Sequence, residues 1–313
     1  MSAKSRLVFA GTPEFAVPCL RDLVAGGHEV AAVYTQPDRA AGRGRRMTMS
    51  PVKELALQHD IAVMQPENFR DPASIASLQT LAPTLMVVAA YGLILPSAVL
   101  EVPSRGCVNV HASLLPRWRG AAPIARSIEA GDSRSGISLM QMETGLDTGP
   151  VFARAAIDIL DDDTTATLQE RLAELGAKVL IRYIPALLAG TLAAEPQNNE
   201  EACYAKKLTR DEARIDWTLS AERVANKIRA LNPWPVAESE LREHRLRIWH
   251  AVADTVPQPA APGTVVAVGK DGVTVACGIA AVRLTRLQRL GGKVLAPADF
   301  LNGFPIKLGD QFV

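Results

Sequence analysis

Hydrophobic positions in the first two-thirds of the chain alternate between short continuous runs and amphipathic stretches. The continuous runs are typical of strands buried on both faces of a parallel sheet. Strands are expected at 6–10, 28–36, 61–64, 85–90, 107–110, 136–141 and 151–159. Helices are expected at 13–25, 51–59, 72–81, 122–130 and 165–188. This alternation predicts an α/β domain over residues 1–189, with a doubly wound, mostly parallel, Rossmann-like sheet.

The pattern changes after residue 189. Residues 190–206 are polar and lack periodicity, which is typical of a linker. One helix is then expected at 220–231, and short alternating strands are expected at 246–252, 263–268, 272–277 and 281–287. Such strands predict a small β-barrel over residues 207–313, for which an oligonucleotide-binding (OB-like) barrel is one candidate.

The composition is that of a globular protein. The 313 residues are 48% hydrophobic and 21% charged, which excludes disorder and leaves enough apolar surface for a sizeable core. The longest apolar run, Leu85–Leu95, is shorter than the roughly 18 residues of a membrane span. The four cysteines form no Cys-x-x-Cys pair. We therefore expect a cytoplasmic protein with no membrane segment, no metal site and no disulfide.

Charge is unevenly distributed along the chain. Residues 1–204 carry 18 Lys and Arg against 22 Asp and Glu, a balance of −4, whereas residues 205–313 carry 16 against 11, a balance of +5. A basic C-terminal part indicates an anionic macromolecular partner, although a merely solvated basic face would give the same count.

Two nucleotide-binding motifs are missing from the chain. Neither Gly-x-Gly-x-x-Gly nor the phosphate loop Gly-x-x-x-x-Gly-Lys-Ser/Thr occurs. A dehydrogenase or an NTPase of these classes would lack the backbone amides that hold phosphates, so we interpret Gly11 as a plain turn between strand and helix.

Candidate catalytic side chains lie at the end of one buried strand and in a later glycine-containing loop. Asn109 and His111 are two positions apart, so their side chains project from one face at the end of that strand. An amide beside an imidazole can bind an oxyanion during acyl transfer. Asp147, between Gly145 and Gly149, could orient the imidazole or take protons through water. The alternatives are a loop-capping Asn, a locally satisfied His and a turn-stabilising Asp.

Cys107 lies on the same strand face as Asn109 and His111. A Cys–His nucleophile is therefore one hypothesis. Because Cys107 comes earlier in the strand, under the sheet, a buried structural thiol is the favoured interpretation.

The segment 37–47 carries the arginines Arg39, Arg43, Arg45 and Arg46 together with Gly42 and Gly44. Arginine-rich loops of this kind suit phosphate backbones and can become ordered on binding. A solvated connector with no ligand is the alternative.

Several stretches together resemble the methionyl-tRNA formyltransferase family. The resemblance runs from residues 9–13 through 31–46 to Asn232-Pro233-Trp234-Pro235, and residues 111–124 are the most specific part. It covers nearly the whole chain.

The resemblance implies both the substrates and the residues that bind them. Asn109, His111 and Asp147 match the catalytic trio of enzymes that use 10-formyltetrahydrofolate as the formyl donor. The segment that matches the folate-binding residues consists of Ser113, Leu114, Leu115 and Pro116. The acceptor would be the α-amino group of methionine on initiator methionyl-tRNA, in translation initiation, with Arg39, Arg43, Arg45, Arg46 and the basic barrel contacting the tRNA. We expect a monomer.

Three other functions remain open at this point. A folate formyltransferase for a small amine, such as the glycinamide ribonucleotide enzyme, would need neither the basic barrel nor the arginines. An RNA-binding protein without catalysis would not need the trio. A hydrolase would use Cys107.

Overall fold

The computed structural model describes residues 5–41, 46–255 and 260–313. The chain divides into two compact units. The first comprises the chain up to Gly120 together with Ser135–Ile157 and Gln169–Tyr204, and the second comprises Ala121–Arg134, Asp158–Leu168 and Ala205–Val313. The predicted functional division at residues 1–189, 190–206 and 207–313 stays a prediction.

The first unit is built around a seven-stranded sheet in the order β10-β9-β7-β6-β1-β2-β5. Its strands are β1 (Arg6–Gly11), β2 (Glu29–Tyr34), β5 (Val63–Met64), β6 (Leu85–Ala89), β7 (Cys107–His111), β9 (Arg134–Gln141) and β10 (Val151–Asp158). Neighbouring strands from β5 to β7 are parallel, whereas β7 and β9 are antiparallel. The predicted mostly parallel, doubly wound sheet is confirmed.

The strand order reverses at β1. The chain runs from β1 to β2 and β5 on one side, and β6 and β7 lie on the other. In open α/β sheets, ligands bind beyond the carboxyl ends of the strands near such a reversal. Those ends are Gly11, Ala89 and His111 for β1, β6 and β7.

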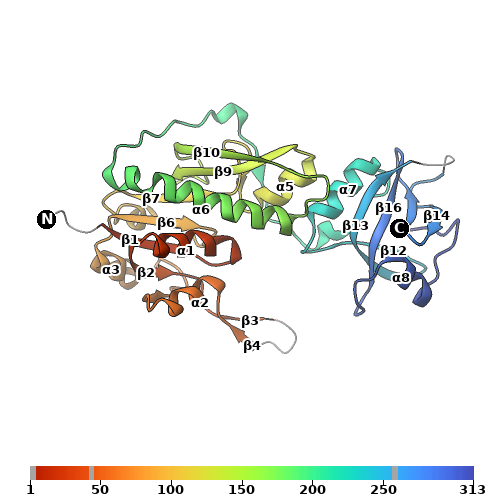
Figure 1. Cartoon of the computed structure of the whole chain (residues 1–313), viewed down its shortest axis with the longest axis horizontal. Helices are drawn as coiled ribbons and strands as arrows, with labels where there is room; N and C mark the ends of the chain where they lie inside the picture. The colour runs from red at the N-terminus through yellow and green to blue at the C-terminus, as the bar shows by residue number, and fades with distance from the viewer. Residues whose placement is uncertain (1–4, 42–45, 256–259) are drawn as a thin grey trace. The chain divides into compact units, whose positions relative to one another are not determined.

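Helices pack on both faces of this sheet (Figure 1). They are α1 (Val17–Ala25), α2 (Pro51–Gln58), α3 (Pro72–Leu81), α4 (Ser97–Leu100) and α6 (Thr165–Ala189). Leu78 of α3 and Val99 of α4 share a core cluster with Met86 of β6. On the other face Gly176 of α6 approaches β7 so closely that an added Cβ would lie 2.9 Å from Val110 Cγ1.

Local sequence explains where two of these helices begin. Ser50 caps α2 because its Oγ accepts a hydrogen bond from the Lys53 N–H at 3.1 Å. Asp71 caps α3 in the same way through Ala73 N–H at 2.9 Å. A proline in the first turn follows each cap, as expected where the N–H has no helical partner.

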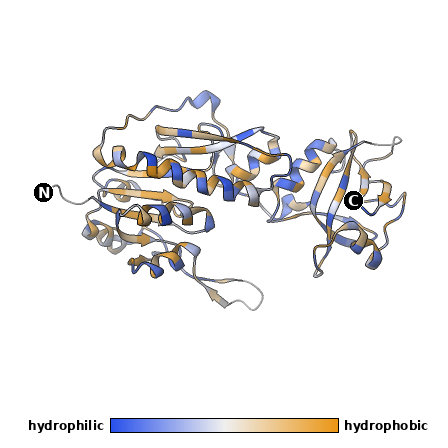
Figure 2. Cartoon of the chain, in the orientation of Figure 1, coloured by the Kyte–Doolittle hydropathy of each residue, from blue (hydrophilic) through white to orange (hydrophobic). Residues whose placement is uncertain are grey.

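β6 is apolar along its length and α6 alternates in polarity (Figure 2).

The second unit holds an antiparallel five-stranded sheet in the order β12-β13-β16-β15-β14. Its strands are β12 (Ala237–Leu241), β13 (His244–Asp254), β14 (Val265–Gly269), β15 (Gly272–Ala276) and β16 (Ala281–Arg289). Phe312 bridges Leu241 of β12, and Gln311 bridges Thr264 beside β14. The C-terminal residues thus join both edges of the sheet, and the predicted small barrel is confirmed.

Helices complete the second unit. They are α5 (Pro123–Ala130), α7 (Ala221–Ala230) and α8 (Pro297–Gly303). α7 packs on α5 and on β13, so its apolar side enters a core that contains Trp217, Ile248 and Phe312.

The sequence pattern did not predict α4, β12 and α8. It also missed elements of two or three residues, namely β3 (Arg39–Ala41), β4 (Arg46–Thr48), β8 (Arg119–Gly120), β11 (Tyr204–Ala205), and the 3-10 turns η2 (Asn199–Glu201) and η3 (Asp211–Ala213). The expected helix at 13–25 begins with a third 3-10 turn, η1 (Glu14–Ala16). β3 pairs with β4, so the ends of the expected arginine loop form a hairpin. β8 pairs with β11, and β11 lies inside the expected linker. Elements of two or three residues are too short to show a period.

Within residues 5–41, 46–255 and 260–313, no helix is long and apolar enough to cross a membrane. The same residues contain no group of three or more His, Cys, Asp or Glu side chains placed to hold a metal ion.

Candidate active site

The carboxyl end of β7 presents the two side chains that the sequence placed on one face. His111 is the last residue of β7 and pairs with Ser138 of β9, and Asn109 pairs with Met140. The period of two in a strand therefore brings both side chains to the edge where open α/β sheets bind ligands.

His111 is almost buried and lies between two acceptors. Its side chain is 6% exposed. Nε2 lies 3.0 Å from the Trp118 carbonyl oxygen, and Nδ1 lies 3.8 Å from Asp147 Oδ2. A carbonyl oxygen can only accept, so Nε2 carries the hydrogen of this contact, and Nδ1 faces the Asp147 carboxylate. The two side chains thus lie side by side, and their catalytic roles stay predictions.

Asp147 is fixed by backbone contacts. Its Oδ2 accepts a hydrogen bond from the Gly120 N–H at 2.7 Å, and its φ of 53° is in the left-handed region, which Asp tolerates better than most residues. At Gly149 an added Cβ would lie 2.0 Å from the Gln141 carbonyl oxygen. This glycine therefore permits a close approach of two backbone segments rather than supplying only flexibility.

Asn109 differs from His111 and Asp147 in the contacts of its side chain. The residue is half-buried. Among the residues with described positions, no hydrogen bond engages its side-chain amide, so it does not cap a loop. A partly accessible amide at the strand end is available to donate to a ligand oxygen.

The segment of Ser113 to Pro116 is held from several sides. Ser138 Oγ donates to the Ser113 carbonyl at 2.7 Å and accepts from the Leu115 N–H at 3.0 Å. Ser113 and Leu115 are 1% and 2% exposed, whereas Leu114 and Pro116 are half-buried. Side-chain contact with a ligand in this conformation would therefore involve Leu114 and Pro116.

The expected arginine cluster is only partly described. Arg39 is exposed on β3, and Arg46 begins β4. Arg43 and Arg45 lie outside the described residues. Next to Arg39, Asp38 accepts a hydrogen bond from Lys53 Nζ at 2.6 Å, which lowers the pKa of Asp38 and ties the hairpin to α2.

The structure argues against Cys107 as a nucleophile. Its side chain is fully buried in the core beneath the sheet. Burial raises the pKa of the thiol to about 12, so almost no reactive thiolate forms near neutral pH. The interpretation of Cys107 as a structural thiol is confirmed, and the hydrolase hypothesis loses its nucleophile.

We expect Cys107→Ala to keep kcat within about threefold of the parent protein and to cost about 1–2 kcal/mol of stability, as a small core deletion does. Steady-state kinetics and thermal unfolding check this. Loss of all turnover in a variant that still unfolds cooperatively would restore the thiol as a catalytic group.

Sequence reasoning missed two residues beside the trio. Arg119 is 2% exposed, and Gln197 comes from the expected linker. Gln197 Nε2 donates to the Asp147 carbonyl at 2.8 Å. Arg119 lies in the specific stretch 111–124, which was a signal for it, but nothing in the polar segment 190–206 singled out Gln197.

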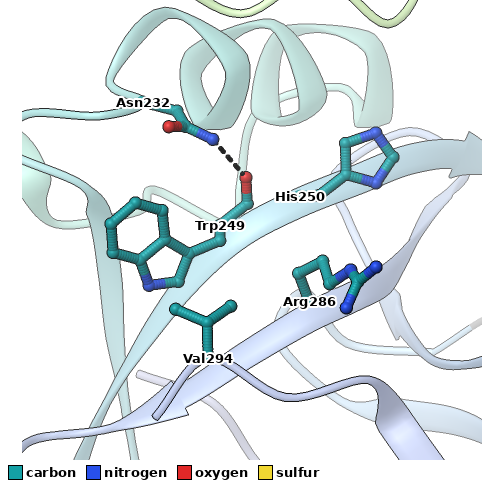
Figure 3. A pocket seen from close by; sticks show the side chains of 5 residues that line it. All are labelled: Asn232, Trp249, His250, Arg286 and Val294. Carbon is teal, nitrogen blue, oxygen red and sulfur yellow. Dashed lines mark hydrogen bonds between the residues drawn. The ribbon is translucent and has the colours of Figure 1, made fainter. Parts of the chain in front are cut away.

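The second unit contains a separate open pocket of about 490 Å³ (Figure 3). It is lined by Asn232, Trp249, His250, Arg286 and Val294. Asn232 Nδ2 donates to the Trp249 carbonyl at 3.0 Å, and the indole N–H donates to Gln288 Oε1 at 2.8 Å. Burial lowers the pKa of His250. Arg286 is exposed and has no hydrogen bond or ion pair within the described ranges.

Models of known protein families match both parts of the chain. The formyl transferase family model matches residues 4–184, and the model of the formyl transferase C-terminal domain matches residues 207–305. A methionyl-tRNA formyltransferase of Pseudomonas syringae pv. syringae is 54% identical over 302 residues, covering 96% of each chain.

Solved structures share the fold. HypX from Aquifex aeolicus, in complex with tetrahydrofolic acid, has a TM-score of 0.64 at 17% identity over 99% of this chain, which spans about half of HypX (51%). Methionyl-tRNA formyltransferase from Clostridium thermocellum has a TM-score of 0.55 at 17% identity, covering 79% of this chain and 93% of that one. Identities this low show the fold alone.

Proposed function

The chain belongs to the formyl transferase family, and from that premise we propose that it formylates the α-amino group of methionine on initiator methionyl-tRNA, for translation initiation. The observation that carries this proposal is the 54% identity to a methionyl-tRNA formyltransferase over 96% of the chain. The rival enzymes for small amines are disfavoured because the same likeness extends through the second unit. The test is formylation of charged initiator tRNA by the purified protein.

The formyl donor is a folate derivative, 10-formyltetrahydrofolate. Its binding residues are Ser113, Leu114, Leu115 and Pro116, of which Leu114 and Pro116 offer partly exposed apolar side chains for the flat ring system. The free amide of Asn109 fits a formyl oxygen. The bound donor supplies an electrophilic formyl carbon on a nitrogen leaving group, and no metal takes part.

The catalytic work falls to Asn109, His111 and Asp147. When the methionine amine attacks the formyl carbon, negative charge develops on the formyl oxygen. The Asn109 amide donates a hydrogen bond to that oxygen, and the Nε2–H of His111 becomes a second donor when it leaves the Trp118 carbonyl. Asp147 orients His111 and receives the proton that the amine loses, and the leaving nitrogen regains a proton. No covalent enzyme intermediate is required, because the amine itself is the nucleophile.

The tRNA contacts Arg39, Arg43, Arg45, Arg46 and the basic second unit. Arginine side chains suit phosphates because the guanidinium donates several hydrogen bonds and stays charged. Within the second unit, the pocket beside Trp249 fits one unpaired nucleotide, with the base against the indole and its phosphate on Arg286. The protein works as a monomer in the cytoplasm.

The assignment of the pocket to a nucleotide predicts the effect of replacing Arg286. Arg286→Gln should raise KM for charged tRNA about three- to tenfold and reduce the slope of its salt dependence by about one, because one phosphate contact is lost. KM for the formyl donor and kcat should not change. Steady-state kinetics over a range of salt concentrations measure all of these quantities.

Arg283→Gln is the matched control, since Arg283 lies on the same strand outside the pocket and pairs with Asp254 at 3.7 Å. If both variants shift KM for tRNA equally, the pocket has no role beyond the general basic charge of this unit.

A further inference from the structure

A glutamine from the segment between the two family domains holds the loop that carries Asp147. Gln197 Nε2 donates to the Asp147 carbonyl at 2.8 Å and to the Gly149 carbonyl at 2.7 Å. One side-chain amide therefore uses both of its hydrogens on the same short loop. Residues 143–146, just before Asp147, are exposed, so few other contacts restrain the loop on that side.

The amide of Gln197 is itself fixed by a buried cation. Gln197 Oε1 accepts from Arg119 Nε at 3.1 Å and from Nη2 at 2.9 Å. This two-pronged contact sets which end of the amide faces Asp147, because the guanidinium can only donate. The Gln197 hydrogens must then point toward the loop.

Arg119 occupies an unusual position for a charged side chain. It is 2% exposed, and within the described ranges its side-chain partners are neutral amides, those of Gln197 and of Asn199 at 2.8 Å. A buried cation loses its hydration, so it binds its few acceptors strongly and tolerates little displacement. The Arg119 backbone N–H also donates to the Cys203 carbonyl at 2.9 Å, which holds the segment containing Gln197 beside β8.

The same stretch of chain restrains the other end of Asp147. Gly120, which follows Arg119, donates its N–H to Asp147 Oδ2 at 2.7 Å. The side chain of Arg119 thus fixes the Asp147 backbone through Gln197, while the next residue fixes the Asp147 carboxylate. Both restraints act where the backbone of Asp147 is in the left-handed region, a conformation that needs support from its surroundings.

We propose that Gln197 and Arg119 are positioning residues for Asp147, which hold its carboxylate in place beside His111 during formyl transfer. This role rests on the proposed function, because it requires Asp147 to act in the reaction. Misplacing a catalytic group by about 1 Å costs about 10²-fold in rate. The tRNA and the folate are bound by other residues, so the effect falls on kcat.

The test uses Gln197→Glu in the full-length protein, after the parent protein has been shown to formylate methionyl-tRNA. Glutamate keeps the length of the side chain and its contact with Arg119 but has no hydrogens to donate to the loop. We expect kcat to fall about 10- to 100-fold, with KM for tRNA and for the donor within about twofold. In an Asp147→Asn background, the same change should lower kcat by less than about twofold, because the group that Gln197 positions is already disabled.

Asn199→Ala is the matched control. It removes a partner of Arg119 that does not touch the Asp147 loop, so kcat should stay within about twofold of the parent value. Unchanged kcat in Gln197→Glu overturns the proposal. So does a loss that is equally large in the Asp147→Asn background, since that result would mean a general structural defect.

Hydrogen exchange of the loop provides a readout that does not depend on activity. Amides of residues 145–149 and of Gly120 should exchange faster in Gln197→Glu, and also in Gln197→Leu if the glutamate variant does not fold. Unchanged exchange in the folded variant overturns the positioning role. A parent protein that formylates no tRNA would instead refute the proposed function, and the exchange rates would still decide whether Gln197 restrains the loop.

Discussion

Replacing Asn109 with alanine is expected to lower kcat for formyl transfer by about 10²- to 10³-fold, the loss typical of removing one donor to a developing oxyanion. The amide lies at the carboxyl end of β7 and is free to meet a ligand oxygen, so its removal should leave no buried group unpaired. Single-turnover kinetics at saturating substrates measure the change. KM for charged tRNA should stay close to the parent value.

The other two members of the trio should behave alike. His111→Ala and Asp147→Asn are each expected to lower kcat at least about 10²-fold, because the first removes the imidazole and the second removes the carboxylate charge beside it. Asparagine at position 147 can still accept from the Gly120 N–H, so the loop conformation is retained and only the charge is lost. Near-normal kcat in any of these variants removes that residue from the mechanism.

Changing Arg43 and Arg45 together to alanine is expected to raise KM for charged tRNA about 10- to 100-fold. Two charge-assisted contacts to phosphate are lost, and each also contributes to the salt dependence. The slope of log(kcat/KM) against log salt should therefore become shallower by about two. Affinity for the formyl donor should not change.

The control for this double variant removes the same charge elsewhere. Arg70 and Arg182 are both exposed in the first unit, and their joint replacement by alanine should leave KM for tRNA within about twofold. If the Arg43 and Arg45 variant keeps the parent salt slope, the arginine segment is a solvated connector and does not contact the tRNA.

The main features of the fold could be predicted because they depend on periodicity. Continuous apolar runs such as Leu85–Ala89 are buried central strands, and the spacing of Asn109 and His111 placed both on one face of β7. The period of two is a property of the backbone, so it holds wherever a strand forms. Closure of the barrel was harder to predict from the sequence. Gln311 and Phe312 meet the edges of the sheet through isolated bridges, and these are too short to show a strand pattern.

The surroundings of the site could not be predicted from pattern alone. Arginine is usually exposed, so nothing in composition marks Arg119 as a buried cation. Gln197 lies in a polar stretch without periodicity, and its contacts come from residues at least 48 positions away in sequence. Hydrogen bonds between residues so far apart in sequence depend on tertiary structure, which local propensity does not encode.

One measurement tests the central claim most directly. The purified protein is incubated with 10-formyltetrahydrofolate and with methionine attached either to initiator tRNA or to elongator tRNA, and formylmethionine is quantified after release from the tRNA. The account predicts rapid formylation of the initiator species and slow formylation of the elongator species. It also predicts loss of product in the Asn109→Ala variant. Absence of formylmethionine with the parent protein, or undiminished product with Asn109→Ala, would contradict it.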